Sequence, residues 1–289
     1  MNTSRKPILL NLDIGDQLTS VSCGHIIVEL IKFIAYQRFQ IPYTYQWLKQ
    51  VVSKKKACEN EEIKDSFQSE RHFRAASTAL ENLDFLLKSL QQEMNSSSLP
   101  DEVCIALGAT PVTCKEVYRV LLPTTCHKLQ CQSKLIASDQ KIQTNVFRTL
   151  VTSEELGQIF FNQLAPTNLY VFLKKKLVNN QDSILNSDNF VFTSGCRLPR
   201  NSKIIVIDLR TKLLDNIACC NELNIYGDSV VNEDLMKLHL DDSNDNTEVY
   251  HEIESSDNVK WYQSCYVIKG FKDCVVNGSS VTNSWLNCS

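Results

Sequence analysis

The first strong pattern is a run of apolar side chains from His25 to Arg38. A run with so few polar positions is typical of a helix that is buried on more than one side. Ile26, Leu30 and Phe33 recur at i, i+4 and i+7, and the next member of this stripe, at i+11, is Gln37. We therefore expect Gln37 to lie at the rim of the core, where a polar side chain is able to face a partner.

A second helix is predicted from Arg71 to Met94 by apolar residues spaced alternately three and four apart. A coiled coil is the alternative for such a seam, but only about three heptads are available and strand-like segments surround it. Packing of this helix on a sheet is therefore favoured. The seam consists of Phe73, Ala76, Leu80, Leu83, Leu87, Leu90 and Met94.

Short apolar runs predict the strands of that sheet. Val103–Leu107, which is closed by Gly108, and Lys203–Leu209 are the clearest, and Asn168–Leu173 and Asn189–Thr193 are weaker. Because strands and helices do not alternate strictly along the chain, the predicted fold class is α+β.

A short helix is predicted between two of these strands. The stretch Thr152-Ser-Glu-Glu155 has the Thr-x-x-Glu pattern of a capping box, in which the first residue caps the helix and the fourth reaches back to it. Pro166 limits how far this helix extends, because proline lacks the backbone N–H that a helix interior needs.

Two segments are distinguished by their charge. Residues 54–70 are rich in charged residues and poor in apolar ones, which predicts a charged loop. Residues 215–258 contain twelve acidic side chains and one basic side chain, Lys237. This composition predicts an acidic loop or insertion, and the alternative is a docking segment for a basic partner.

The overall composition excludes several classes of protein. With 289 residues, of which 43% are hydrophobic, the chain is able to bury a substantial core. A formal net charge of −3 provides no general basic field for nucleic acid, so we expect no nucleic-acid partner. No segment is long and apolar enough for a membrane span or a signal peptide, so we expect a soluble, intracellular protein without a membrane partner.

Motifs for catalysis and cofactor binding are sparse. The eight glycines form neither a GxGxxG motif nor a phosphate loop, and no histidine lies in an HExxH motif. Among the twelve cysteines, the cluster that suggests a metal site is Cys126, His127 and Cys131, but no second Cys/His pair follows at finger spacing. We therefore expect a protein that is not an enzyme and that holds no metal or cofactor. A metal-dependent or thiol enzyme that uses Cys126, His127 and Cys131 is kept as an alternative.

Several stretches, taken in order, resemble a known family. Tyr36-Gln-Arg38, Pro42 and Trp47-Leu-Lys49 look like the end of the first core helix of HORMA-domain proteins. Further stretches are similar to the comet family, a group of HORMA-like adaptors that bind the spindle checkpoint protein Mad-two (Mad2). These are the long helix to Met94, Val103–Gly108, Lys115–Tyr118, Arg197–Pro199 with the strand after it, Trp261-Tyr-Gln263 and Lys269-Gly-Phe271.

The resemblance implies a fold and a function. The implied fold is a single HORMA-like α+β domain over residues 1–289, with three main helices packed on a mostly antiparallel sheet and a C-terminal belt segment.

The implied function is to bind the closed conformer of Mad2 as a HORMA to HORMA heterodimer. The adaptor then presents Mad2 to an AAA+ ATPase of the Pch-two type, which converts it to the open form. This step disassembles the mitotic checkpoint complex and silences the checkpoint. The implied location is the nucleus and cytoplasm, with the kinetochore or spindle in mitosis.

The same resemblance implies which residues bind the partner. The family's surface combines the end of the first helix with an aromatic residue on a later helix. Gln37 matches the first part, flanked by Tyr36 and by Arg38, which is able to form a fork to a carboxylate. Phe160 aligns with the contact aromatic. Helical periodicity instead places Phe161 about 100° further round the helix and makes it the more exposed residue. Both phenylalanines are therefore candidates, with Phe160 preferred by the alignment.

A C-terminal belt is also implied. In HORMA proteins the C-terminal portion wraps around a bound peptide, and here the candidate belt or self-ligand residues are Trp261, Tyr266, Lys269 and Phe271. Tyr266–Ile268 is expected to be one belt strand, and the tail over residues 274–289 is expected to occupy the domain's own peptide site. The alternative function is that of a different HORMA protein, which binds a short peptide motif under this belt.

Overall fold

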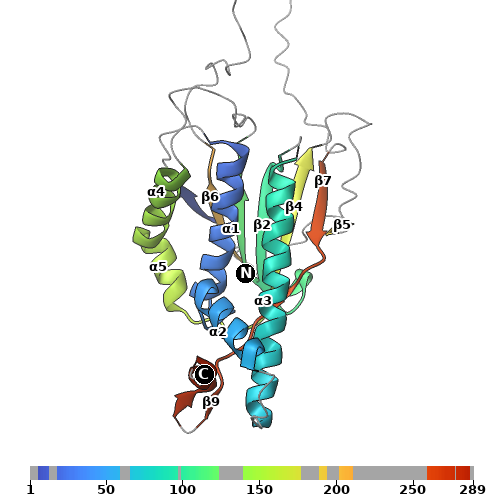
Figure 1. Ribbon diagram of the computed structural model, residues 1–289. Coiled ribbons are helices and arrows are strands. Elements are labelled where there is room, and N and C mark those ends of the chain that lie inside the picture. The colour runs from blue at the N-terminus through green and yellow to red at the C-terminus, as the bar shows by residue number, and fades with distance from the viewer. Residues whose placement is uncertain are drawn as a thin grey trace, which may run out of the picture.

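The protein has a mixed α+β fold in which helices cover one face of a mostly antiparallel sheet (Figure 1). The computed structural model describes residues 6–12, 18–58, 66–96, 99–123, 139–176, 189–193, 202–210, 259–276 and 278–286. The α+β class predicted from the sequence is confirmed. The helices in these residues are α1 (Ser20–Gln37), α2 (Tyr45–Cys58), α3 (Phe67–Met94), α4 (Asp139–Thr152), α5 (Glu154–Phe161) and α7 (Val281–Leu286).

The main sheet has the strand order β1-β6-β3-β2-β4-β7-β5. β6 pairs in parallel with β1 and with β3, and the other pairs are antiparallel. β7 and β8 pair in turn with the same edge of β4. The strands are β1 (Ile8–Asn11), β2 (Glu102–Gly108), β3 (Cys114–Leu121), β4 (Asn168–Lys176), β5 (Phe190–Thr193), β6 (Lys203–Asp208), β7 (Val259–Ser264) and β8 (Ile268–Lys269).

The core lies between the sheet and the helices α1 and α3, which run side by side across it (Figure 1). α1 is buried on more than one side, as its apolar run predicts, and every member of the α3 seam is buried. All seven residues of β2 are buried as well, because this strand lies at the centre of the sheet. A smaller cluster that includes Cys104, Tyr170 and Phe172 packs on the opposite face.

Both long helices begin earlier than their apolar patterns suggest, because polar residues cap them. The backbone N–H of Ser22 donates to the hydroxyl of Thr19, which caps α1, at 3.0 Å. The hydroxyl of Ser66 accepts from the N–H of Ser69 in the same way at the start of α3. Each cap satisfies a donor that the first turn of a helix leaves without a partner.

Two predictions about local structure were wrong. The cap of α5 is Ser153, whose hydroxyl accepts from the N–H of Leu156, while the hydroxyl of Thr152 donates to the carbonyl of Arg148 inside α4. The predicted capping box was therefore one residue out of register. Part of the charged loop predicted for residues 54–70 is helical, since residues 54–58 belong to α2 and residues 67–70 to α3, and residues 59–65 lie outside the described part of the chain.

Several predictions concern residues outside the described part of the chain. These are the acidic segment over residues 215–258, Arg197–Pro199, and the cluster of Cys126, His127 and Cys131. Within the described residues, no group of three or more His, Cys, Asp or Glu side chains is placed to hold a metal ion. No helix among them combines the length and apolar character needed to cross a membrane.

The C-terminal tail folds back onto α2 and the start of α3, at the lower end of the molecule in Figure 1. It forms a small separate sheet from β9 (Val275–Val276) and β10 (Ser279–Ser280), followed by α7. Trp285 of α7 is only 1% exposed, and its indole N–H donates to the hydroxyl of Ser69 at 2.9 Å. Its ring lies 5.5 Å from the rings of His72 and Phe73. The tail therefore contributes to the core of the domain.

Polar contacts join the same tail to Tyr43, which lies between α1 and α2, and to His72 of α3. The hydroxyl of Tyr43 donates to the carboxylate of Asp273 and lies 3.1 Å from Nε2 of His72, and the hydroxyl of Ser280 donates to Asp273 at 2.8 Å. Burial, with the hydrogen bond to Asp273, raises the pKa of Tyr43 well above its usual range. Burial lowers the pKa of His72, although the Asp273 carboxylate opposes the shift.

Candidate functional site

The end of α1 is a tight turn that exposes some side chains and buries others. The N–H of Arg38 still donates to the carbonyl of Ile34 at 2.9 Å, whereas Phe39 adopts a positive φ of 53° and ends the helix. Tyr36 and Phe39 are exposed and Gln37 is half-buried. The prediction that Gln37 lies at the rim of the core agrees with this placement.

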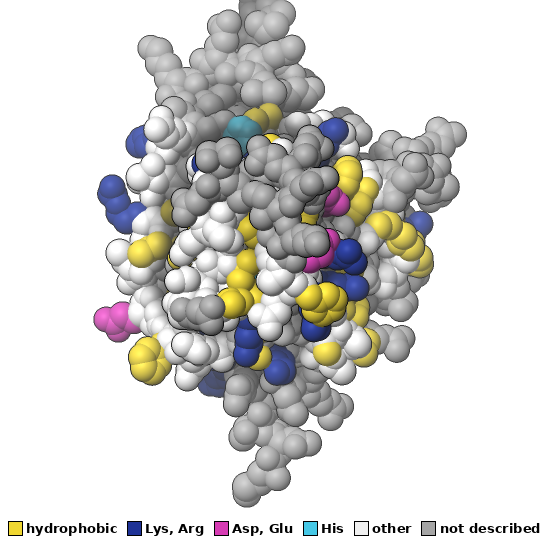
Figure 2. Space-filling view, turned by 60° about the horizontal axis from the view of Figure 1, so that its bottom comes forward, with side chains coloured by type: hydrophobic (Ala, Val, Ile, Leu, Met, Phe, Trp, Pro, Cys, Tyr) yellow, Lys and Arg dark blue, Asp and Glu magenta, His cyan; other side chains and the backbone are white. Residues whose placement is uncertain are grey.

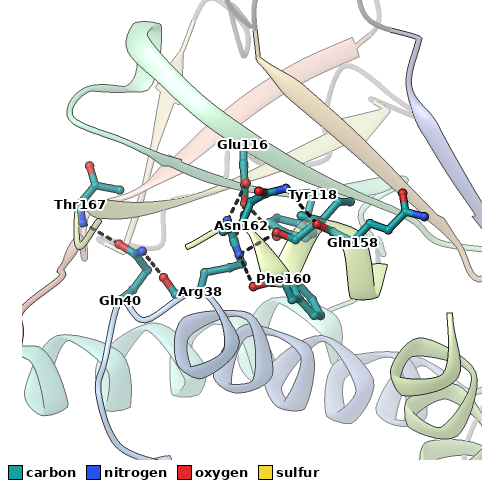
Figure 3. A network of polar contacts seen from close by, with 9 residues as sticks. Arg38, Gln40, Glu116, Tyr118, Gln158, Phe160, Asn162 and Thr167 are labelled. Carbon is teal, nitrogen blue, oxygen red and sulfur yellow. Dashed lines mark hydrogen bonds and ion pairs between the residues drawn. The ribbon is translucent and has the colours of Figure 1, made fainter. Parts of the chain in front are cut away.

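Arg38 is not available to a partner, because only 1% of it is exposed. Its guanidinium makes two parallel hydrogen bonds to the carboxylate of Glu116 in β3, each 2.8 Å long. The interpretation of Arg38 as a fork for a carboxylate on the partner is therefore corrected: the fork is formed, but its acceptor belongs to the same chain. Figure 3 shows the side chain of Arg38 directed away from α1 toward this acceptor.

The same guanidinium also holds the end of α5. It donates to the backbone carbonyls of Ile159 at 3.1 Å and Asn162 at 2.9 Å (Figure 3). The carbonyls at the end of a helix lack partners within the helix, and the partial negative charge there favours a cation. Arg38 therefore joins three elements, since it bonds from the end of α1 to β3 and to the C-terminal turn of α5.

Tyr118 completes the buried polar cluster. Its hydroxyl donates to Glu116 at 3.1 Å, and burial followed by the adjacent Glu116 charge raises the pKa of Tyr118 well above its usual value. The phenol therefore stays neutral and remains a donor to the carboxylate. Among the described residues, the polar side chains of this cluster are paired with one another or with backbone carbonyls of the same chain, which is typical of a structural ion pair.

Gln40 is a second buried polar residue at this junction, and the sequence patterns did not single it out. Its side-chain N–H donates to the carbonyl of Arg38 at 2.6 Å, and its side-chain oxygen accepts from the N–H of Thr167 at 2.6 Å (Figure 3). The N–H of Phe271 donates to the backbone carbonyl of Gln40 at 3.0 Å. Gln40 therefore links the end of α1 to the start of β4 and to the segment after β8.

The close approach of this last segment requires a glycine. The N–H of Gly270 donates to the carbonyl of Thr167 at 2.8 Å. A Cβ at position 270 would lie only 2.5 Å from that carbonyl oxygen and 2.9 Å from the side-chain oxygen of Gln40. Close packing against Thr167 and Gln40 therefore explains the glycine in the motif Lys269-Gly-Phe271.

The two phenylalanines of α5 have different environments. Phe160 is half-buried, and its ring meets that of Phe33 edge to face with centroids 5.8 Å apart. The guanidinium of Arg38 lies 5.8 Å from the Phe160 ring. Phe161 is 87% exposed. Helical periodicity therefore predicted the exposed residue correctly, and Phe160, preferred by alignment, contributes to the packing between α5 and α1.

Arg38 follows the end of α1 and binds the backbone at the end of α5, so these two helix ends are neighbours. We use the name helix-junction surface for the exposed and half-buried side chains at these ends, which are Tyr36, Gln37, Phe39 and Phe161. Large exposed aromatics on rigid elements are frequent anchors of protein interfaces. Figure 2 views the lower end of the molecule and shows separate hydrophobic side chains among basic ones, with few acidic side chains.

The four candidate belt residues do not form one site. Trp261 in β7 packs against the cluster on the face of the sheet opposite the helices. Tyr266 stacks on Phe85 of α3 with centroids 5.3 Å apart, and Phe271 lies 5.6 Å from His72. Lys269 is exposed in β8. The predicted strand at Tyr266–Ile268 is displaced, since β7 ends at Ser264 and β8 begins at Ile268.

A family model described as p31comet, Mad1 and Cdc20-bound-Mad2 binding, matches residues 8–168. No individual curated protein matches the sequence. The matched segment covers more than half of the chain and runs from β1 to the start of β4, so it contains the whole helix-junction surface. The HORMA-like architecture expected from the resemblance is confirmed by this match together with the fold. The chain belongs to the p31comet family and is a Mad2-binding adaptor.

Proposed function

We propose that this protein binds the closed conformer of Mad2 through the helix-junction surface, with Phe161 as the anchor and Gln37 as the residue that fixes orientation. The observation that carries the proposal is the 87% exposure of Phe161 on a helix end that Arg38 holds in place. An aromatic side chain on a fixed backbone loses little conformational freedom when a partner covers it. The amide of Gln37 is able to donate and to accept hydrogen bonds across the interface.

The proposed consequence of binding is remodelling of Mad2 by a partner enzyme. The adaptor presents Mad2 to an AAA+ ATPase of the Pch-two type, which converts Mad2 to its open form, disassembles the mitotic checkpoint complex and silences the checkpoint. The sequence supports this division of labour, because it contains no phosphate loop and the ATP chemistry would belong to the partner. An assay in which Mad2 opens with ATP and the ATPase but without this chain would count against the proposal.

The proposed location follows from the same role. A protein that acts on checkpoint complexes is expected in the nucleus and cytoplasm, and at the kinetochore or spindle in mitosis. Imaging of the tagged chain through the cell cycle tests this expectation, and persistent exclusion from all of these places would contradict it.

Phe161→Ala is expected to weaken binding of Mad2 by about 2 kcal/mol, or roughly 30-fold, because anchor aromatics typically contribute this much or more. The stability of the free chain should hardly change, since the side chain contacts little of its own domain. Gln37→Ala is expected to weaken binding by a smaller factor. Isothermal titration with Mad2 bound to a Cdc20 peptide measures both.

Phe67→Ala is the matched control, because Phe67 is a phenylalanine that is 82% exposed at the start of α3 and does not belong to the helix-junction surface. Its affinity should equal that of the wild type. Phe160→Ala should lower stability because of the lost contact with Phe33. The proposal fails if the wild-type chain does not bind Mad2, or if Phe161→Ala binds as tightly as Phe67→Ala.

A further inference from the structure

A groove of about 450 Å³ lies between α1, α4 and the start of α2. One face of α1 lines it through Glu29, Lys32, Phe33 and Tyr36, which recur at i, i+3, i+4 and i+7. Phe33 is shared with the stripe of α1 that packs into the core, whereas Glu29, Lys32 and Tyr36 lie outside that stripe. The remaining lining consists of Thr44, Tyr45 and Gln46 of the segment that begins α2, and Gln143, Thr144 and Phe147 of α4.

The charges in this groove are already satisfied. The ammonium of Lys32 donates to Glu29 at 2.7 Å and lies 4.6 Å from the centre of the Tyr45 ring. The hydroxyl of Tyr45 donates to Asp84 at 2.9 Å, and burial with this contact raises the pKa of Tyr45 to about 12, so the phenol stays neutral. With one cation and one anion paired to each other, the groove favours an uncharged occupant over a charged one.

The groove is continuous with the helix-junction surface. The ring of Phe33 packs edge to face against Phe147 on one side and against Phe160 on the other, with 5.8 Å between centroids in both pairs. Tyr36 belongs both to the groove lining and to the helix-junction surface. A partner that covers Phe161 and Gln37 therefore meets the groove when its contact extends along α1.

The size of a specific interface makes such an extension necessary. Stable complexes bury about 800 Å² on each partner, spread over roughly 20 to 30 residues. The helix-junction surface has only four residues, so it provides a small part of such an interface. The adjoining apolar surface in the described part of the chain is this groove, whose volume lies in the range of about 300–1,000 Å³ that is typical of binding pockets.

We infer that the groove between α1, α2 and α4 is a second anchor site of the Mad2 interface and accepts an uncharged aliphatic or aromatic side chain of Mad2. The inference rests on the proposed function and adds to it the type of Mad2 side chain that the groove binds. The anchored side chain lies on the part of Mad2 next to the part that covers Phe161. Gln46, Gln143 and Thr144 in the lining provide donors and acceptors for the backbone that carries it.

Thr144→Trp tests the inference, because an indole at this exposed position of α4 fills the groove. Thr149→Trp is the matched control: Thr149 is also an exposed threonine of α4, and both hydroxyls donate to the carbonyl four residues earlier, at 2.8 Å and 2.9 Å. Thr149 does not line the groove. Thr144→Trp should weaken binding of Cdc20-peptide-bound Mad2 at least tenfold, and Thr149→Trp should bind like the wild type. Isothermal titration measures the dissociation constants.

The outcomes separate this inference from the proposed function. If Thr144→Trp binds like the wild type while Phe161→Ala is weakened, the groove is not an anchor site and the proposed function stands. If both tryptophan variants are weakened equally, bulk on α4 is the cause and the inference is wrong. If wild-type chain does not bind Mad2, both fail. Should Thr144→Trp not fold, Gln46→Trp fills the groove from α2. If the chain forms a dimer, and Thr144→Trp or Gln46→Trp abolishes this dimer, the groove binds a second copy of the chain instead of Mad2.

Discussion

Arg38→Ala is expected to lower the free energy of unfolding by about 3–5 kcal/mol, because it leaves a buried carboxylate without its cation. Glu116 is buried, and the neutral hydroxyl of Tyr118 would remain its hydrogen-bond donor in place of a cation. The carbonyls of Ile159 and Asn162 would also lose their charged donor. Urea denaturation followed by circular dichroism measures the change.

The expected effect on binding is larger than the lost stability alone suggests. Arg38 is buried within the chain, but it holds the end of α5 that carries Phe161. The variant should therefore bind Mad2 more weakly even at temperatures at which it remains folded. Arg38 is a positioning residue, and its effect on affinity should largely disappear in a chain that already carries Phe161→Ala.

A matched control is provided by Arg74, whose guanidinium forms a pair with Glu70 at 3.0 Å on the exposed face of α3. Exposed pairs of this kind contribute about 0.3–0.5 kcal/mol, so Arg74→Ala should be nearly neutral. Combining Arg38→Met with Glu116→Gln should recover part of the stability, because no uncompensated charge is then buried. Equal losses for Arg38→Ala and Arg74→Ala would show that the buried pair does not stabilise the domain.

Trp285→Ala is expected to cost about 3–5 kcal/mol of the free energy of unfolding, which is typical of deleting a fully buried tryptophan. The indole packs against His72 and Phe73 and donates to Ser69, so its removal leaves both a cavity and an unpaired hydroxyl. α7 has six residues and is too short to be stable alone. Loss of this anchor should therefore release the tail, and thermal and urea unfolding should both report the change.

Trp285→Phe separates packing from hydrogen bonding, because it keeps a ring and removes the donor to Ser69. It should cost about 1 kcal/mol from the hydrogen bond, in addition to a smaller packing loss. Val275→Ala, in the exposed part of the same tail, should be nearly neutral. A chain that lacks residues 273–289 should be at least as unstable as Trp285→Ala. An unchanged melting temperature in that truncated chain would show that the tail does not stabilise the domain.

The elements that were predicted from the sequence are those whose patterns repeat locally. The α3 seam was predicted because a three–four spacing places its members on one face of a helix, and that face is buried. β2 and β6 were predicted because each contains an unbroken apolar run, which is typical of a strand with neighbours on both sides. α2 was not assigned, although Leu48, Val51 and Val52 are buried on one side of it, because its lysines obscure the short apolar pattern.

Long-range pairs explain what the sequence did not predict. Arg38 and Glu116 are 78 positions apart, and no local spacing connects them. For the same reason, nothing in the residue types distinguishes the buried side chains of Arg38 and Gln40 from the less buried side chain of Gln37. Periodicity, in contrast, identified Phe161 as the exposed aromatic, because Leu156 and Ile159 fix which side of α5 faces the core.

The central claim is that Mad2 covers the helix-junction surface, and hydroxyl-radical footprinting of the full chain tests it most directly. Phe161 and Phe67 are almost equally exposed in the free chain, so they should be oxidised at comparable rates. Addition of Cdc20-peptide-bound Mad2 should slow the oxidation of Phe161, Phe39 and Tyr36 and leave that of Phe67 unchanged. A complex in which Phe161 remains as reactive as it is in the free chain would contradict the account.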